Sequence, residues 1–163
     1  MKVASVKELK SALQELTPIE LNEIILRLAR LKKENKELLS YLLFDVGDEP
    51  GYIAEIKNYL DEEFRQVNPT HPYFAKKNIR RILRRSKRLS AYSESEITHI
   101  ETLLYFLEKM RSLAPNIQQS PTIQRLCFSQ AVAIEKILSK MHPDLQYDYR
   151  KRLHSLPSNE ADL

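Results

Sequence analysis

The sequence predicts an all-α protein, and three observations support that fold class. Apolar residues recur at the helical period over four long stretches, eight prolines separate those stretches, and no stretch alternates with period two between turn residues. Proline is tolerated in the first turn of a helix and excluded from its interior, so these prolines separate one helix from the next. We therefore expect seven or eight mostly antiparallel helices in an irregular bundle, and no β-sheet.

Eight helices are expected along the chain from the apolar pattern and the capping signals. Three of them begin with the spacing of a capping box, in which a Ser or Thr is followed three residues later by Glu. A fourth begins with Ser120 as N-cap and Pro121 in the first turn. The expected helices span 5–15, 18–33, 35–45, 51–67, 72–90, 94–113, 121–141 and 144–154. The capping boxes are Ser5 with Glu8, Thr17 with Glu20, and Ser93 with Glu96.

Four of these helices carry a continuous apolar face that a bundle would bury. The chain is long enough for one domain with a sizeable core, which we assign to residues 1–156, with a frayed tail at 157–163. A short solenoid of HEAT-like helix pairs is the alternative, because the later helices begin about 22–26 residues apart, although no residue pattern repeats at that spacing. One of the four faces consists of Ile19, Leu21, Ile24, Ile25, Leu28 and Leu31.

The composition excludes several classes of protein. Only two glycines occur, and neither a P-loop nor a dinucleotide-binding motif is present, so nucleotide enzymes of those types are excluded. Cys127 is the only cysteine, which precludes an intrachain disulfide. The first residues lack the apolar segment of a secretory signal, and no apolar run approaches the ~20 residues of a membrane span. We expect a soluble cytoplasmic protein that does not bind membranes.

Positive charge is concentrated in the helix expected at 72–90. Residues 64–93 contain nine Lys or Arg and no Asp or Glu, whereas residues 1–63 contain nine Lys or Arg against thirteen Asp or Glu. At the helical period the cations occupy about half the circumference, opposite an apolar side. These cations are Lys76, Lys77, Arg80, Arg81, Arg84, Arg85, Lys87 and Arg88.

Three interpretations of this basic helix remain open. Like charges at i,i+4 repel by a few tenths of a kcal/mol per pair, and that repulsion is offset by a polyanion, by an acidic protein surface, or by water and salt alone. The polyanion would be nucleic acid, whose phosphates release counterions when neutralised. The acidic surface would belong to a partner or to residues 61–63 of this chain. Tyr73 and Tyr92 flank the run and are candidates for stacking on bases.

No pattern points to a catalytic or metal site. Glu96 and His99 have the Glu-x-x-His spacing of carboxylate-bridged metal bundles, but no second such pair occurs, and we interpret His99 as a hydrogen-bonded core residue. Cys127 lies within an apolar face, which favours a core thiol over a reactive thiolate. Glu63 is expected to pair with the basic helix. We therefore expect no enzymatic activity, no metal and no cofactor.

Two stretches resemble a family of bacterial all-helical proteins of unknown function. One is Leu9–Phe44, in which Leu16-Thr17-Pro18-Ile19-Glu20-Leu21 leads into residues 27–39, and the other is Tyr73–Arg84. The resemblance implies an all-α fold and carries over no activity and no site residues.

The sequence as a whole favours a non-enzymatic binding protein. Its basic helix would engage a polyanion, foremost the backbone of RNA or DNA, through phosphate contacts with little readout of bases. The alternative is a helical scaffold or adaptor that docks an acidic partner protein, with the basic face solvated or paired within the chain. An enzyme ranks third.

Overall fold

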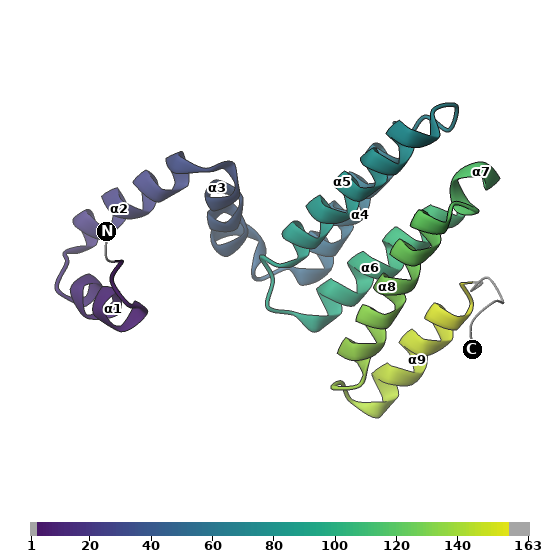
Figure 1. Cartoon of the computed structure of the whole chain (residues 1–163). Coiled ribbons are helices and arrows are strands. Elements are labelled where there is room, and N and C mark those ends of the chain that lie inside the picture. The colour runs from purple at the N-terminus through teal and green to yellow at the C-terminus, as the bar shows by residue number, and fades with distance from the viewer. Residues whose placement is uncertain (1–2, 157–163) are drawn as a thin grey trace. The chain divides into compact units, whose positions relative to one another are not determined.

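The computed structural model describes residues 3–156, and their regular structure is entirely helical, which confirms the predicted fold class. The tail expected at 157–163 lies outside the described residues. No helix in the described part is long and apolar enough to cross a membrane. The helices are α1 (Val6–Gln14), α2 (Pro18–Leu31), α3 (Lys33–Ser40), a π-helical turn (Tyr41–Asp45), α4 (Glu49–Arg65), α5 (Pro72–Ser90), α6 (Glu96–Arg111), α7 (Pro115–Gln118), α8 (Pro121–Leu138) and α9 (Pro143–His154) (Figure 1).

The chain divides into two compact units, and the first comprises residues 1–46. Its first two helices begin at the expected capping boxes. Ser5 N–H donates to Glu8 Oε2 at 2.7 Å while Glu8 N–H donates to Ser5 Oγ at 3.3 Å, and Thr17 and Glu20 make the same exchange. These bonds satisfy N–H groups that the first helical turn leaves without a partner.

Unit 1 departs from expectation at the boundary between its second and third helices. The helix expected at 18–33 ends at Leu31, because Lys32 has an extended backbone (φ −143°, ψ 145°) and the chain resumes as α3 at Lys33. The amide of Asn35 reaches back across this break to donate to the Leu28 carbonyl at 2.8 Å. The helix expected at 35–45 accordingly begins two residues early and finishes in the π-helical turn.

No residue of α1, α2 or α3 is buried. Leu28 is 50% exposed, and the other members of its predicted apolar face are at least partly exposed. The period of the apolar residues therefore identified the helix correctly, but the expected burial of its apolar face is not observed.

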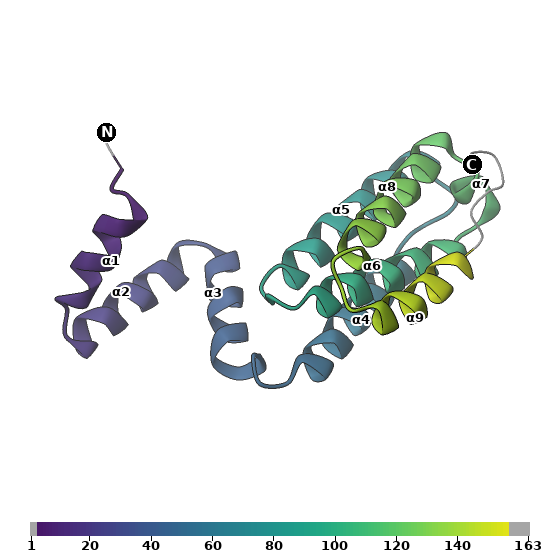
Figure 2. The same ribbon diagram turned by 90° about the horizontal axis from the view of Figure 1, so that it is seen from below.

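The second unit, residues 47–163, contains the hydrophobic core. Its long helices lie side by side and alternate in direction, as predicted (Figures 1 and 2). Helix α6 packs against α4, α5 and α8 and is buried on most sides, with Ile100, Leu104 and Phe106 fully enclosed. Phe106 belongs to the core together with all but one of the apolar residues that recur at helical spacing, the exception being the exposed Ile97. These residues are Ile97, Ile100, Leu103, Leu104, Leu107 and Met110.

The capping box expected at Ser93 and Glu96 is wrong. Helix α6 begins two residues later than expected, with Ser95 as its N-cap, whose hydroxyl accepts from the Thr98 N–H at 3.4 Å. The Ser93 hydroxyl instead donates to Glu49 at 2.8 Å and accepts from the Ser95 N–H at 3.0 Å. A distant carboxylate thus recruits Ser93, and local spacing alone does not reveal such a partner.

Two smaller differences concern α7 and α8. Helix α7 is a single turn that the sequence did not predict, and α8 ends at Leu138 instead of residue 141. Ser120 is the N-cap of α8 with Pro121 in the first turn, as expected, but its hydroxyl makes no capping hydrogen bond.

Candidate nucleic-acid interface

Helix α5 occupies the predicted residues 72–90, and its apolar side fixes it to unit 2. Ile79 and Ile82 are completely buried, and Ser86 donates its hydroxyl to the Leu83 carbonyl at 3.0 Å within the same buried strip. At the other end of the helix, the Tyr52 hydroxyl of α4 donates to the Leu89 carbonyl at 2.8 Å. The helix is therefore held from its core side, and its opposite side faces solvent.

Most of the predicted cations lie on that solvent side. Lys76 and Arg85 are half-buried at its edges. The remaining six are exposed, and they are Lys77, Arg80, Arg81, Arg84, Lys87 and Arg88. Helix α5 thus presents a basic surface along most of its length, as the sequence indicated.

Acidic residues of α4 neutralise only part of this surface. Arg81 donates to Glu63 Oε2 at 2.5 Å, which confirms the expected pairing of Glu63 with the basic helix. Burial raises the pKa of Tyr59 beside this pair, and Glu63 adds to the rise. Asp61 does not contribute, because it binds Lys109 and Tyr105 of α6.

Five of the cations make no ion pair within residues 3–156: Lys76, Lys77, Arg80, Arg84 and Lys87. Four of these, Lys77 through Lys87, recur every three or four residues and so share one side of the helix. Their spacing is roughly 5 Å along the helix axis. We call these four residues the basic stripe.

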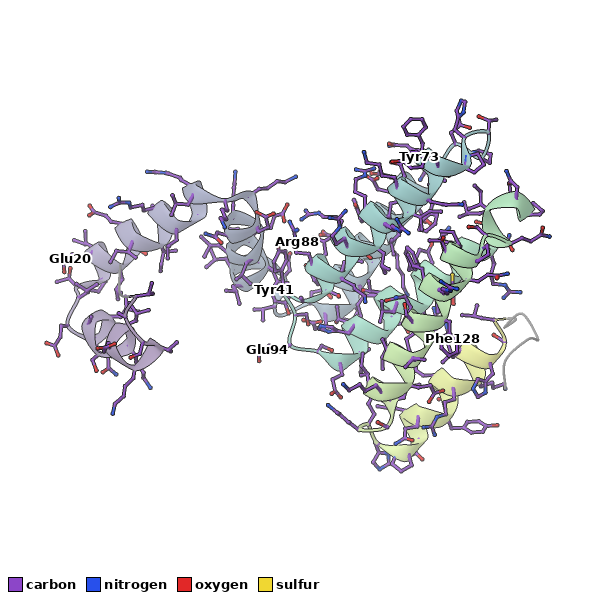
Figure 3. The ribbon with its side chains drawn as sticks, in the orientation of Figure 1. Glu20, Tyr41, Tyr73, Arg88, Glu94 and Phe128 are labelled. Atoms are coloured by element: carbon purple, nitrogen blue, oxygen red, sulfur yellow. The ribbon has the colours of Figure 1, made fainter. Side chains whose placement is uncertain are left out.

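An exposed aromatic cluster begins the same helix. The Tyr73 and Phe74 rings meet edge to face with centroids 5.5 Å apart, and His71 lies edge to face with Phe74 at 6.3 Å. Tyr73 is 75% exposed and Phe74 60% exposed. Tyr73 precedes Lys77 by four residues, so it continues the basic stripe at one end of α5, while Arg88 lies near the other end (Figure 3). Tyr92, the other predicted stacking residue, is half-buried beyond the helix end.

A network of charged side chains joins α4, α6 and α9. Glu101 accepts from Lys57 at 2.6 Å and from Arg152 at 2.7 Å, and Arg152 also donates to Glu108 at 2.8 Å. Burial alone would raise the pKa of Glu101, but these hydrogen bonds outweigh it and hold the pKa below its ordinary value. The carboxylate is therefore ionised at neutral pH and serves to attach α9 to the bundle.

The residues singled out for catalysis or metal binding are not assembled into a site. His99 Nδ1 lies 2.9 Å from the Ser95 carbonyl, and since a carbonyl only accepts, this nitrogen carries the proton. Burial raises the pKa of Cys127 to about 11, so its half-buried thiol is protonated at neutral pH. Across residues 3–156, no three His, Cys, Asp or Glu side chains gather as metal ligands.

A depression of about 440 Å³ lies at one end of unit 2, between the end of α4 and the segment after α6. Its charged lining includes Asp61, Arg65 and Lys109. The hydrogen bonds from Lys109 and Tyr105 outweigh burial and lower the pKa of Asp61. A carboxyl group that acts as a general acid or base needs a pKa raised toward the working pH. The pKa of Asp61 is lowered instead.

Unit 1 contains a second surface feature that sequence reasoning did not identify. A groove of about 580 Å³ runs between α2 and α3 and continues into the π-helical turn. Its apolar lining includes Leu26, Leu39, Leu43 and Phe44, and Phe44 is 79% exposed. Four cations border this lining, namely Arg30, Lys32, Lys33 and Lys36, of which Lys33 pairs with Glu37 at 3.6 Å.

Comparison with known proteins adds no family to this description. No protein-family model, no curated protein and no solved structure matches the chain.

Sequence reasoning found the basic stripe but missed Phe74, His71 and the groove. The signal for Phe74 was present, because Pro72 at the first helical position places residues 73 and 74 in the opening turn, before the buried positions begin. The groove had no such signal. Its lining comes from two helices whose relative orientation depends on the break at Lys32.

Proposed function

We propose that this protein binds nucleic acid through the exposed side of α5, chiefly by contacts to the phosphate backbone. The observation that carries the proposal is the basic stripe: four exposed cations in register on one side of a helix, none of them in an ion pair within residues 3–156. The four cations repel one another. Binding to phosphates neutralises their charge, which relieves this repulsion and releases counterions from the nucleic acid.

The position of the stripe supports this proposal over a purely structural role. A helix whose arginines were needed for the fold would direct them at acids of neighbouring helices, as Arg81 does with Glu63. The stripe residues are fixed by the buried opposite side of α5 and contribute no described ion pair. This arrangement suits backbone recognition, because a rigid element presents several donors to successive phosphates.

The experiment is to measure binding of labelled mixed-sequence DNA and RNA across a series of salt concentrations. With the four stripe residues and Lys76 engaged, the slope of log K against log salt should be about −4 to −5 for duplex DNA. Replacing the stripe by Gln (Lys77→Gln, Arg80→Gln, Arg84→Gln and Lys87→Gln together) should bring the slope closer to zero by about 3 to 4. The variant should keep its helical circular dichroism, since the replaced side chains are exposed.

A matched control separates local contacts from net charge. Arg125, Lys136, Lys140 and Lys151 are exposed cations outside α5, and changing them to Gln removes the same formal charge. This control should retain most of the affinity and slope. Equal losses in both quadruple variants, or no binding by the unmodified protein at low salt, would rule out the proposed interface.

A second candidate function is favoured by the groove of unit 1. Its apolar floor and its border of Arg30, Lys32, Lys33 and Lys36 complement an amphipathic helix whose apolar stripe is flanked by acidic residues. In this adaptor function the partner is a protein, and the groove of unit 1 is its docking surface.

This candidate is tested with two synthetic amphipathic peptides that share an apolar stripe, one flanked by Glu and one by Lys. The acidic peptide should bind, and Leu43→Glu should abolish binding, whereas Ile19→Glu, at an exposed position outside the groove lining, should not. Isothermal titration calorimetry gives both affinities. Equal affinity for the two peptides would contradict the charge complementarity on which this candidate rests.

A further inference from the structure

Resting on the nucleic-acid binding proposed above, we infer that the α5 surface selects single strands, with Tyr73 and Phe74 forming a stacking platform for unpaired bases. The evidence is the juxtaposition of two exposed rings with the basic stripe on one helix. Single-strand binders combine these same two elements, cations that follow the backbone and aromatic faces on which bases stack.

The geometry of the two rings favours this role over ordinary packing. They meet edge to face at 5.5 Å, so the face of at least one ring is turned away from its neighbour. Both side chains remain more than half exposed, although aromatic residues are the ones that gain most from burial. Both rings therefore lie at the surface, where an unpaired base can reach them.

The register on α5 relates the rings to the phosphates. Tyr73 occupies the same side as Lys77, one helical turn away, and Phe74 lies at the edge of that side nearer Arg81. A strand that follows the basic stripe toward the start of α5 therefore reaches the rings directly after its last lysine contact. Bases in a duplex are stacked on one another and present only their edges, whereas an unpaired base offers its whole face to a ring.

The test compares a mixed-sequence single strand of about 15 nucleotides with the duplex that it forms with its complement. Binding of the full chain is measured by fluorescence anisotropy at several salt concentrations. The unmodified protein should prefer the single strand. Tyr73→Ala with Phe74→Ala should weaken single-strand binding roughly 10- to 100-fold, by loss of stacking on one or two bases, and leave duplex binding unchanged.

Two control variants address packing and folding. Phe128→Ala removes an aromatic side chain of similar exposure, 65%, from α8, and it should have no effect on either affinity. Tyr73→Phe with Phe74→Tyr keeps both faces and should retain the preference. The alanine variant should also keep the salt slope of the single-strand complex, because the phosphate contacts are intact.

The possible results distinguish the stacking of single strands on Tyr73 and Phe74 from the proposed binding of the phosphate backbone. If the protein binds duplex as well as single strand and the alanine variant binds both normally, the stacking platform is refuted while backbone binding stands. If neither form binds at low salt, both are refuted. If the alanine variant loses duplex and single-strand binding equally, the two rings support the conformation of α5 and do not stack on bases, and the inference also fails.

Discussion

Helices α2 and α6 have comparable apolar patterns in the sequence and opposite environments in the structure. Leu104 of α6 is completely buried among three neighbouring helices, whereas Leu28 of α2 retains half of its exposure. Both helices are capped by hydroxyl side chains and both carry a run of branched residues. The difference teaches that apolar periodicity predicts a helix, while burial depends on which other elements pack against it.

The largest test of this contrast replaces one leucine in each helix. Leu104→Ala should destabilise the protein by about 2–5 kcal/mol, because it removes buried methyl groups and leaves a cavity. Leu28→Ala should cost less than about 0.5 kcal/mol, since water already contacts that side chain. Urea denaturation followed by circular dichroism measures both. A cost for Leu28→Ala near that of Leu104→Ala would show that Leu28 is enclosed in solution, and the contrast between the two helices would fail.

A second test uses acid to weaken the charged network that joins α6 to α9. The pKa of Glu101 is lowered in the folded protein, so its stabilising effect is complete above the ordinary value of 4.5 and is lost as the pH falls below it. Glu101→Gln should therefore reduce stability by about 1–3 kcal/mol at pH 7 and flatten the loss of stability on acidification. Thermal unfolding between neutral and acidic pH measures both effects.

Glu62→Gln is the matched control for that experiment, because Glu62 is exposed on α4 and makes no ion pair within residues 3–156. It should change stability by less than about 0.5 kcal/mol. If the two variants lose stability alike, the acid sensitivity reflects net charge, and the network around Arg152 has no specific role.

The regular elements were largely predictable because their signals are local. Pro72 and the alternation of Ile79, Ile82 and Leu83 with cations specify α5 to the residue at both ends, and the capping residues Ser5 and Thr17 each act on a backbone N–H three positions away. Interactions of this range depend on the chain's own geometry and do not require knowledge of the fold.

The features that escaped prediction depend on residues far apart in the chain. Ser93 is drawn from its expected capping role by Glu49, forty-four positions away, and Glu101 pairs with Arg152 at a separation of fifty-one. The candidate site divides in the same way. Its cations are recognisable in the sequence because they lie close together along the chain. The ion pair between Arg81 and Glu63, in contrast, depends on how α4 packs beside α5.

The smallest predicted effect compares one helix cap in each unit. Ser95→Ala removes the N-cap of α6 and should lower global stability by about 1 kcal/mol, because the core cannot form without that helix. Thr17→Ala removes an equivalent cap from α2, where no residue is buried, so its cost should be confined to local fraying. Hydrogen exchange should then accelerate at the amides of Glu20 and Leu21, with no shift in the main urea transition. A shift as large as that of Ser95→Ala would mean that α2 unfolds together with the bundle, and the contrast between the units would then be one of exposure and not of cooperativity.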